Sequence, residues 1–133
     1  MSNEGYDIIF RVDGGGGYGV AMGHVYHCRR LARQLAGLGL RPCFMMRDYR
    51  AGVEKIKDTG YPLHTIPEHA GEHEITPLLM NLATRYGASI YLDVRDENSC
   101  IINAASKAGI LTFVYEDEML TEVAPDVLFN PSP

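Results

Sequence analysis

Short apolar runs alternate along the chain with longer segments in which apolar residues recur at helical spacing. Several runs are apolar without interruption, which is typical of strands buried on both faces of a parallel sheet. The pattern predicts strands at about 7–12, 41–46, 62–66, 89–94, 110–115 and 126–130. It predicts helices at about 23–38, 50–58, 74–86 and 98–108, and a short helical turn in 118–124.

The alternation of strands and helices indicates the fold class. Helices that join successive strands by right-handed crossovers build a parallel sheet covered on both sides. We therefore expect an α/β domain with a Rossmann-like three-layer fold and a parallel sheet of about six strands. With 133 residues, 46% of them apolar, the chain can form one full core, so residues 1–133 are expected to be a single domain. Residues 1–6 are short and polar, and we expect them to be disordered.

Composition narrows the class of partner. The chain has 12 Lys and Arg against 17 Asp and Glu, a net charge of -5, and no basic run that would favour nucleic acid or anionic membrane. It has neither an apolar run long enough for a membrane span nor an apolar targeting core at its start. Cys28, Cys43 and Cys100 are odd in number and widely spaced, so disulfides are not expected. We expect a cytoplasmic protein that binds neither nucleic acid nor membrane.

A glycine-rich loop joins the first predicted strand to the first predicted helix. Five of the 14 glycines lie between Gly14 and Gly19. Glycine tolerates positive φ and lets a ligand approach bare backbone, so such a loop is suited to a ligand site. Asp13 ends the strand and His24 begins the helix, so both residues are expected to face one cleft and to carry its chemistry.

The same loop has a second interpretation. Gly14, Gly16 and Gly19 fit the GxGxxG pattern of dinucleotide-binding proteins, with Asp48 as the ribose acid. In that pattern the helix begins within the glycines, whereas here three further residues precede Gly23, and the spacing to Asp48 is too long. An NAD(P) site is therefore the weaker alternative, and we expect no cofactor.

His24 is the candidate general base. At the first turn of a helix the macrodipole favours the neutral imidazole that a base requires. An Asp13 carboxylate at one ring nitrogen would fix the tautomer and leave the other nitrogen to take a proton from water. A histidine at a helix start can also serve only to satisfy backbone groups. The pairs His24 with His27 and His69 with His73 lack a third ligand at a matching spacing, so no metal site is expected.

Acidic residues follow most of the predicted strands. Because the carboxyl ends of parallel strands share one edge of the sheet, these residues should line the ligand side. Carboxylates repel diphosphate but accept hydrogen bonds from sugar hydroxyls, so this edge suits a sugar or a proton-transfer centre. The residues that follow the strands are mostly acidic and comprise Asp13, Arg47, Asp48, residues 67–73, Asp93, Arg95, Asp96, Glu116 and Asp117.

The segment FRVDGGGGYGVAMGHVYHCRRLARQL, residues 10–35, resembles the opening of a known enzyme family. These are the UDP-sugar hydrolases of the pseudaminic acid pathway and their relatives in spore-coat polysaccharide synthesis. They share an R-x-D strand end, a loop of small residues and G-H-x-x-R-x-x-x-L-A. YLDVRD, FVYEDEM and DVLFNPSP are similar to later segments of the family. Two features differ: the loop between Asp13 and His24 is longer, and His27 replaces an arginine.

The resemblance implies the N-terminal half of a GT-B fold, with residues 130–133 at the start of a linker to a second half-domain, covalent or separate. It implies hydrolysis of a UDP-sugar at the anomeric carbon, with His24 as general base and Asp13 as its catalytic partner. A related transferase, a non-catalytic module that binds a nucleotide sugar or a partner protein, and an NAD(P)-binding domain stay open. The substrate-binding residues that we expect are Arg11, Gly14, Gly16, Gly19, Gly23, Asp93, Glu116 and Asp117.

Overall fold

The computed structural model describes residues 5–15, 22–94, 98–115 and 127–129. In this part of the chain, six strands form one sheet in the order β3-β2-β1-β4-β5-β6, and every neighbouring pair is parallel. The fold class predicted from the sequence is therefore confirmed. The elements are β1 (Ile8–Val12), α1 (Gly23–Gly37), β2 (Pro42–Arg47), α2 (Arg50–Lys57), β3 (Leu63–Ile66), α3 (Glu72–Tyr86), β4 (Ser89–Asp93), α4 (Asn98–Ala108), β5 (Thr112–Tyr115) and β6 (Val127–Phe129).

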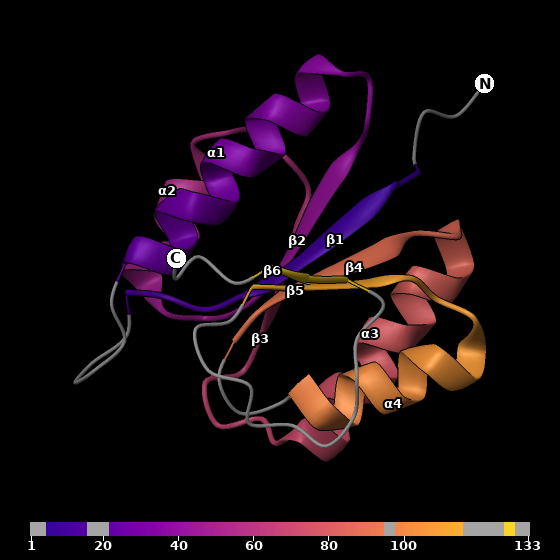
Figure 1. The fold of residues 1–133 in the computed structure, drawn as a ribbon. Coiled ribbons are helices and arrows are strands. Elements are labelled where there is room, and N and C mark those ends of the chain that lie inside the picture. The colour runs from indigo at the N-terminus through magenta and orange to yellow at the C-terminus, as the bar shows by residue number, and fades with distance from the viewer. Residues whose placement is uncertain (1–4, 16–21, 95–97, 116–126, 130–133) are drawn as a thin grey trace.

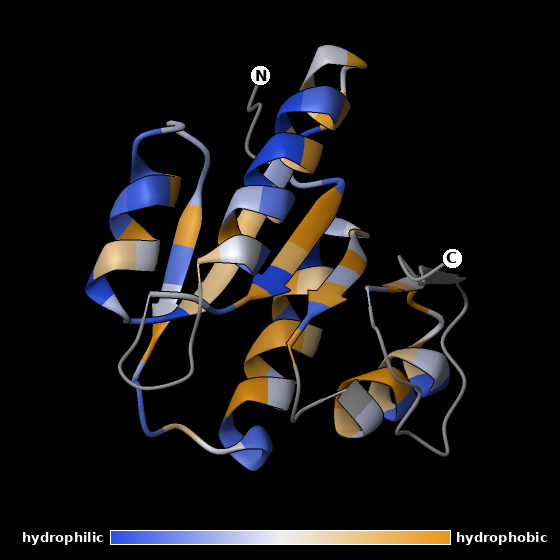
Figure 2. Ribbon diagram, turned by 60° about the vertical axis from the view of Figure 1, so that its left-hand side comes forward, coloured by the Kyte–Doolittle hydropathy of each residue, from blue (hydrophilic) through white to orange (hydrophobic). Residues whose placement is uncertain are grey.

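The helices cover both faces of the sheet. Figure 1 shows α1 and α2 on one face and α3 and α4 on the other. Side chains of β1 alternate between the two resulting cores: Phe10 packs with Val25 of α1, and Ile9 packs with Leu79 of α3. The strands are largely hydrophobic, whereas α1 and α2 carry hydrophilic residues on their outward faces (Figure 2). None of the helices in the described ranges is long and apolar enough to cross a membrane.

Helix α3 begins earlier than the pattern predicts. It starts at Glu72 rather than near Glu74, after an extended Gly71. Both glutamates lie in the first turn, where negative charge interacts favourably with the positive end of the helix dipole. His73 therefore belongs to this first turn, and its side chain is exposed, as is that of His69 in the preceding segment.

Three predictions concern the ends of the chain. The helical turn at 118–124 and the linker at 130–133 lie outside the described residues, as do residues 1–4 of the segment expected to be disordered. Tyr6 is described, and its ring packs against the core on the α3 side. Its centroid lies 4.6 Å from that of Tyr86.

The strand order places a topological switch point between β1 and β4. From β1 the chain continues through α1 to β2 on one side, and from β3 it returns through α3 to β4 on the other. Val12 and Asp93, the last residues of β1 and β4, are paired in register. Ligands of open α/β sheets bind outside the carboxyl ends of the strands at such a point. Asp13, Asp93 and the start of α1 meet here.

Candidate functional site

A histidine–aspartate pair lies at the switch point. His24 is the second residue of α1, and its Nδ1 is 2.7 Å from Oδ1 of Asp93, the last residue of β4. The Asp93 side chain is 2% exposed, whereas that of His24 is 41% exposed. A carboxylate beside one imidazole nitrogen places the N–H on that nitrogen, which makes Nε2 the basic nitrogen. This geometry is suited to general base catalysis.

The second carboxylate oxygen of Asp93 faces a thiol. Cys28 lies one turn after His24 on α1, and its Sγ donates to Oδ2 of Asp93 at 3.5 Å. Burial, together with the charge of Asp93, raises the pKa of the Cys28 thiol well above its ordinary value. The sulfur therefore keeps its proton and acts as a hydrogen-bond donor.

Asp13 has different partners from those predicted. Arg11 donates to its two oxygens from Nη1 at 2.7 Å and from Nη2 at 3.0 Å. The backbone N–H of Arg47 and its Nη1 donate at 2.8 and 2.9 Å. Although burial opposes it, these hydrogen bonds and the two positive charges hold the pKa of Asp13 below its ordinary value. The expected pairing of Asp13 with His24 is wrong, because Asp93 occupies that place and arginines engage both oxygens of Asp13.

The two arginines connect the ends of adjacent strands. Arg11 is fully buried, and its Nη1 also lies 3.2 Å from the carbonyl oxygen of Val12. Arg47 donates from Nη2 to the carbonyl oxygen of Ala70 at 2.8 Å. Asp13 and its partners thus tie β1, β2 and the segment before α3 together. Arg11, which we expected to bind substrate, is enclosed in this ion-pair cluster.

The glycine loop packs against α2. Gly15 has φ +79°, and a Cβ added there would lie 2.5 Å from the backbone nitrogen of Gly52. A Cβ at Gly52 would collide with the carbonyl oxygen of Gly14. The first glycines therefore allow a close approach between the loop and a helix, whereas a Cβ at Gly23 would meet open space.

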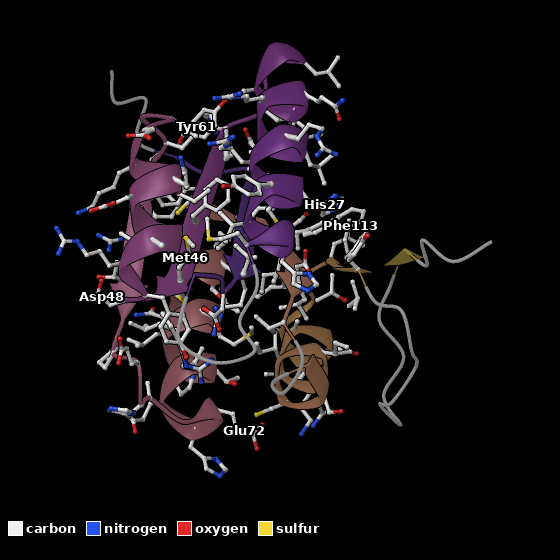
Figure 3. All side chains as sticks on the ribbon, turned by 90° about the vertical axis from the view of Figure 1, so that its left-hand side faces the viewer. His27, Met46, Asp48, Tyr61, Glu72 and Phe113 are labelled. Atoms are coloured by element: carbon white, nitrogen blue, oxygen red, sulfur yellow. The ribbon has the colours of Figure 1, made fainter. Side chains whose placement is uncertain are left out.

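Other predicted site residues fall elsewhere. Gly16, Gly19, Glu116 and Asp117 lie outside the described residues. Asp48 is exposed just before α2, and Figure 3 shows it on the opposite side of the view from His27.

Aromatic and imidazole groups surround the histidine–aspartate pair. Nε2 of His27 is 2.8 Å from the hydroxyl of Tyr91, and the His27 ring centroid is 4.3 Å from that of Tyr115. The Tyr115 ring also meets the His24 ring edge to face, with centroids 6.5 Å apart. Burial lowers the pKa of His27, against the charge of Asp93, and burial raises that of Tyr91. Asp93 therefore lies among groups that favour their neutral forms.

The sequence analysis did not assign a role to three residues near the pair: Cys28, Tyr91 and Tyr115. The spacing could have pointed to Cys28, because it is four residues after His24 and residues four apart lie on the same face of a helix. Tyr115 is the last residue of its strand, at the same edge of the sheet as Asp93. In the described part of the chain, no three His, Cys, Asp or Glu residues are grouped so that they could hold a metal ion.

No protein-family model matches the chain, and no curated protein matches it. A solved structure shares its fold. The crystal structure of MurG from Acinetobacter baumannii superposes with a TM-score of 0.63 at 17% sequence identity. The match covers 84% of this chain and 35% of MurG, so the chain spans about a third of the length of that protein. At this identity the similarity shows the fold alone, and it confirms a GT-B-like α/β fold.

Proposed function

We propose that the chain is the catalytic half of a nucleotide-sugar hydrolase, or of a related glycosyltransferase-like enzyme, with His24 as general base. The observation that carries the proposal is the 2.7 Å contact between Nδ1 of His24 and Oδ1 of Asp93, a carboxylate that is 2% exposed at its side chain. The imidazole is 41% exposed and lies at the switch point of the sheet. A buried carboxylate behind a partly exposed imidazole orients the ring and strengthens it as a base.

The proposed reaction is a single displacement at the anomeric carbon. Nε2 of His24 takes a proton from water while the water oxygen forms a bond to that carbon. The bond from the carbon to the diphosphate oxygen breaks, and its electron pair leaves with the nucleoside diphosphate. The products are the free sugar, inverted at the anomeric carbon, and UDP, and the imidazolium then returns its proton to solvent. A sugar hydroxyl in place of water would give the transferase reaction.

In this scheme Asp93 takes the role that the sequence analysis gave to Asp13. Its negative charge stabilises the imidazolium that forms as water loses its proton. It does so at short range and in a buried position, where charges interact more strongly than in water. Asp13 instead holds the strand ends in place and contributes no proton transfer.

The proposed substrate is a UDP-sugar, with UDP-N-acetylhexosamines as the first compounds to test. The GT-B-like fold supports this class, as does the resemblance of residues 10–35 to the UDP-sugar hydrolases of nonulosonic acid and surface polysaccharide synthesis. In a GT-B arrangement a second half-domain, covalent or separate, would hold most of the UDP. The exposed side of His24 would then face the sugar across the cleft.

The first test titrates sugar nucleotides into the 133-residue chain and monitors binding by amide and histidine side-chain NMR. UDP-N-acetylglucosamine and UDP-N-acetylgalactosamine are compared with UDP alone and with NAD. Shifts at His24, Asp93 and Tyr115 that need the sugar nucleotide are the expected result. The 133-residue chain alone is expected to be inactive, so hydrolysis is assayed in a two-domain protein that contains it and whose wild type releases UDP. There the matched variant His24→Gln should bind the sugar nucleotide but release no UDP. Equal UDP release by wild type and variant would overturn the proposal.

A dinucleotide-binding domain is the second candidate. The strand order β3-β2-β1-β4-β5-β6 is the one found in dinucleotide-binding Rossmann folds, and Asp48 follows β2. Against it, α1 begins at Gly23, so the first glycines pack on α2 instead of opening the helix. Shifts at the glycine loop with NAD but not with sugar nucleotides would favour this candidate. Binding of sugar nucleotides without turnover in any assembly would favour a non-catalytic module.

A further inference from the structure

We infer that Cys28 is a positioning residue for the histidine–aspartate pair. Its thiol holds one oxygen of Asp93 so that the other oxygen faces Nδ1 of His24. The catalytic meaning of this arrangement rests on the proposed function, but the arrangement itself can be tested without any substrate.

The geometry places Asp93 between two residues of one helical turn. His24 and Cys28 are four residues apart on α1 and so project from the same face of that helix. Nδ1 of His24 is 2.7 Å from Oδ1 of Asp93, and Sγ of Cys28 is 3.5 Å from Oδ2. Among the described residues, these two supply the hydrogen-bond contacts of the Asp93 side chain. The carboxylate cannot rotate about its terminal bond without losing one or both contacts.

A thiol is a suitable donor for this purpose because it is weak. A guanidinium at the same place would neutralise Asp93, as Arg11 and Arg47 neutralise Asp13. The thiol fixes the orientation of the carboxylate and leaves its negative charge to act on the imidazole. Cys28 is fully buried and keeps its proton, so it acts neither as a nucleophile nor as a metal ligand here.

The test measures the tautomer of His24 in the 133-residue chain by 15N NMR of the histidine side chains. Wild-type His24 is expected in the form that carries its proton on Nδ1. Cys28→Val keeps the packing but has no donor, so the population with the proton on Nε2 should rise several-fold. Cys28→Ser replaces one donor with another and should keep the wild-type tautomer. Cys28→Ala serves as the second variant without a donor if the valine is not accommodated.

Cys43→Val is the matched control. Cys43 is also fully buried, but it lies on β2 in the core on the α3 side, and its Sγ contacts the carbonyl oxygen of Phe44. It should leave the His24 tautomer unchanged whatever its effect on stability. The inference is overturned if Cys28→Val keeps the wild-type tautomer, or if Cys43→Val shifts it as much.

This result is separable from the proposed function. His24→Gln and the release of UDP test catalysis, whereas the tautomer measurement involves no substrate. A shifted tautomer in Cys28→Val together with unchanged UDP release in His24→Gln would support the positioning role and reject catalysis by the pair. An unshifted tautomer together with loss of release in His24→Gln would reject the positioning role alone.

Discussion

Asp13 and Asp93 are carboxylates at the ends of two adjacent parallel strands, and they differ in almost every contact. Asp13 accepts four hydrogen bonds, all from Arg11 and Arg47. Asp93 meets an imidazole and a thiol. The charge of Asp13 is balanced by two guanidinium groups, whereas Asp93 contacts the partly exposed imidazole of His24. Two carboxylates at the same edge of a sheet therefore have different electrostatic surroundings, and their partners determine the difference.

The largest predicted effect is on stability, from replacing each carboxylate by its amide. Asp13→Asn removes the charge that balances the fully buried Arg11, and loss of one partner of a buried ion pair costs about 3–5 kcal/mol. Asp93→Asn removes a buried charge that meets no arginine among the described residues, so it should cost much less. Urea denaturation of both variants at neutral pH measures the difference.

A surface pair provides the control. Asp7 and Arg41 form an ion pair whose side chains are 34% and 51% exposed, and Asp7→Asn should change stability far less than Asp13→Asn. Equal losses for Asp13→Asn and Asp93→Asn would mean that Asp13 is not the structural member of the two.

The next effect is on turnover, where Asp93→Asn should be more damaging than Asp13→Asn, the reverse of their order for stability. If His24 is the base, Asp93→Asn removes the charge that stabilises the imidazolium, and UDP release should fall about 100-fold or more. The rate of UDP release in His24→Gln should fall at least as far. The assay is release of UDP from a UDP-N-acetylhexosamine, with circular dichroism to verify that each variant is folded.

Tyr115→Phe is a useful comparison in the same assay. It keeps the ring beside His24 and His27 and removes only the hydroxyl, so it should retain most of the turnover. A wild-type rate in Asp93→Asn would show that the contact between His24 and Asp93 is structural.

Local patterns were sufficient to predict the sheet and the helices. Unbroken apolar strands such as Ile8–Val12 and the helical spacing of Val25, Cys28 and Ala32 are properties of neighbouring residues. Helix and strand periods follow from backbone geometry, and the right-handed crossover rule then restricts the topology. The predicted start of α3 near Glu74 was too late, because the helix begins at Glu72, directly after Gly71, with both acidic residues in its first turn.

The partner of His24 could not be predicted in the same way. Asp93 is 69 residues away along the chain, and the sequence analysis placed it at the ligand edge without connecting it to the histidine. Asp13 was the nearer candidate, but it pairs with Arg11 on β1 and with Arg47, which is 34 residues away on β2. Which carboxylate meets which cation depends on strand order and on side-chain direction at the switch point, and neither is visible in local spacing.

A smaller effect concerns the loop beside Asp13. In Gly52→Ala the new methyl group would collide with the carbonyl oxygen of Gly14, and a forced fit of this kind costs about 1–3 kcal/mol. Gly37→Ala is the matched control, since a Cβ at this helical position meets open space and alanine is the better helix former. Thermal or urea denaturation should show a loss for the first variant and a gain for the second. A gain at both positions would contradict the close packing of the loop on α2.

The smallest predicted effect separates the two carboxylate regions by pH. Burial lowers the pKa of His27, which lies beside Asp93, below its ordinary value of 6.5. As pH falls through 6.5, His27 is therefore protonated in the unfolded chain before it is protonated in the folded one. Stability should therefore decline as pH falls below 6.5. The pKa of Asp13 is lowered from 3.8, so its contribution to stability is present above that pH and is lost only as pH falls further.

Urea denaturation of the wild type at pH 7.5 and pH 5 tests this difference. The urea concentration at the midpoint of unfolding should be lower at pH 5 than at pH 7.5. His27→Gln should reduce this difference because its amide does not titrate. His73→Gln, at an exposed position of α3, is the control that should keep the wild-type fall. If His27→Gln keeps the full pH dependence, the decline arises outside the surroundings of Asp93. If His27→Gln removes the pH dependence, the region around Asp93 responds to mild acid and the arginine-bound Asp13 does not.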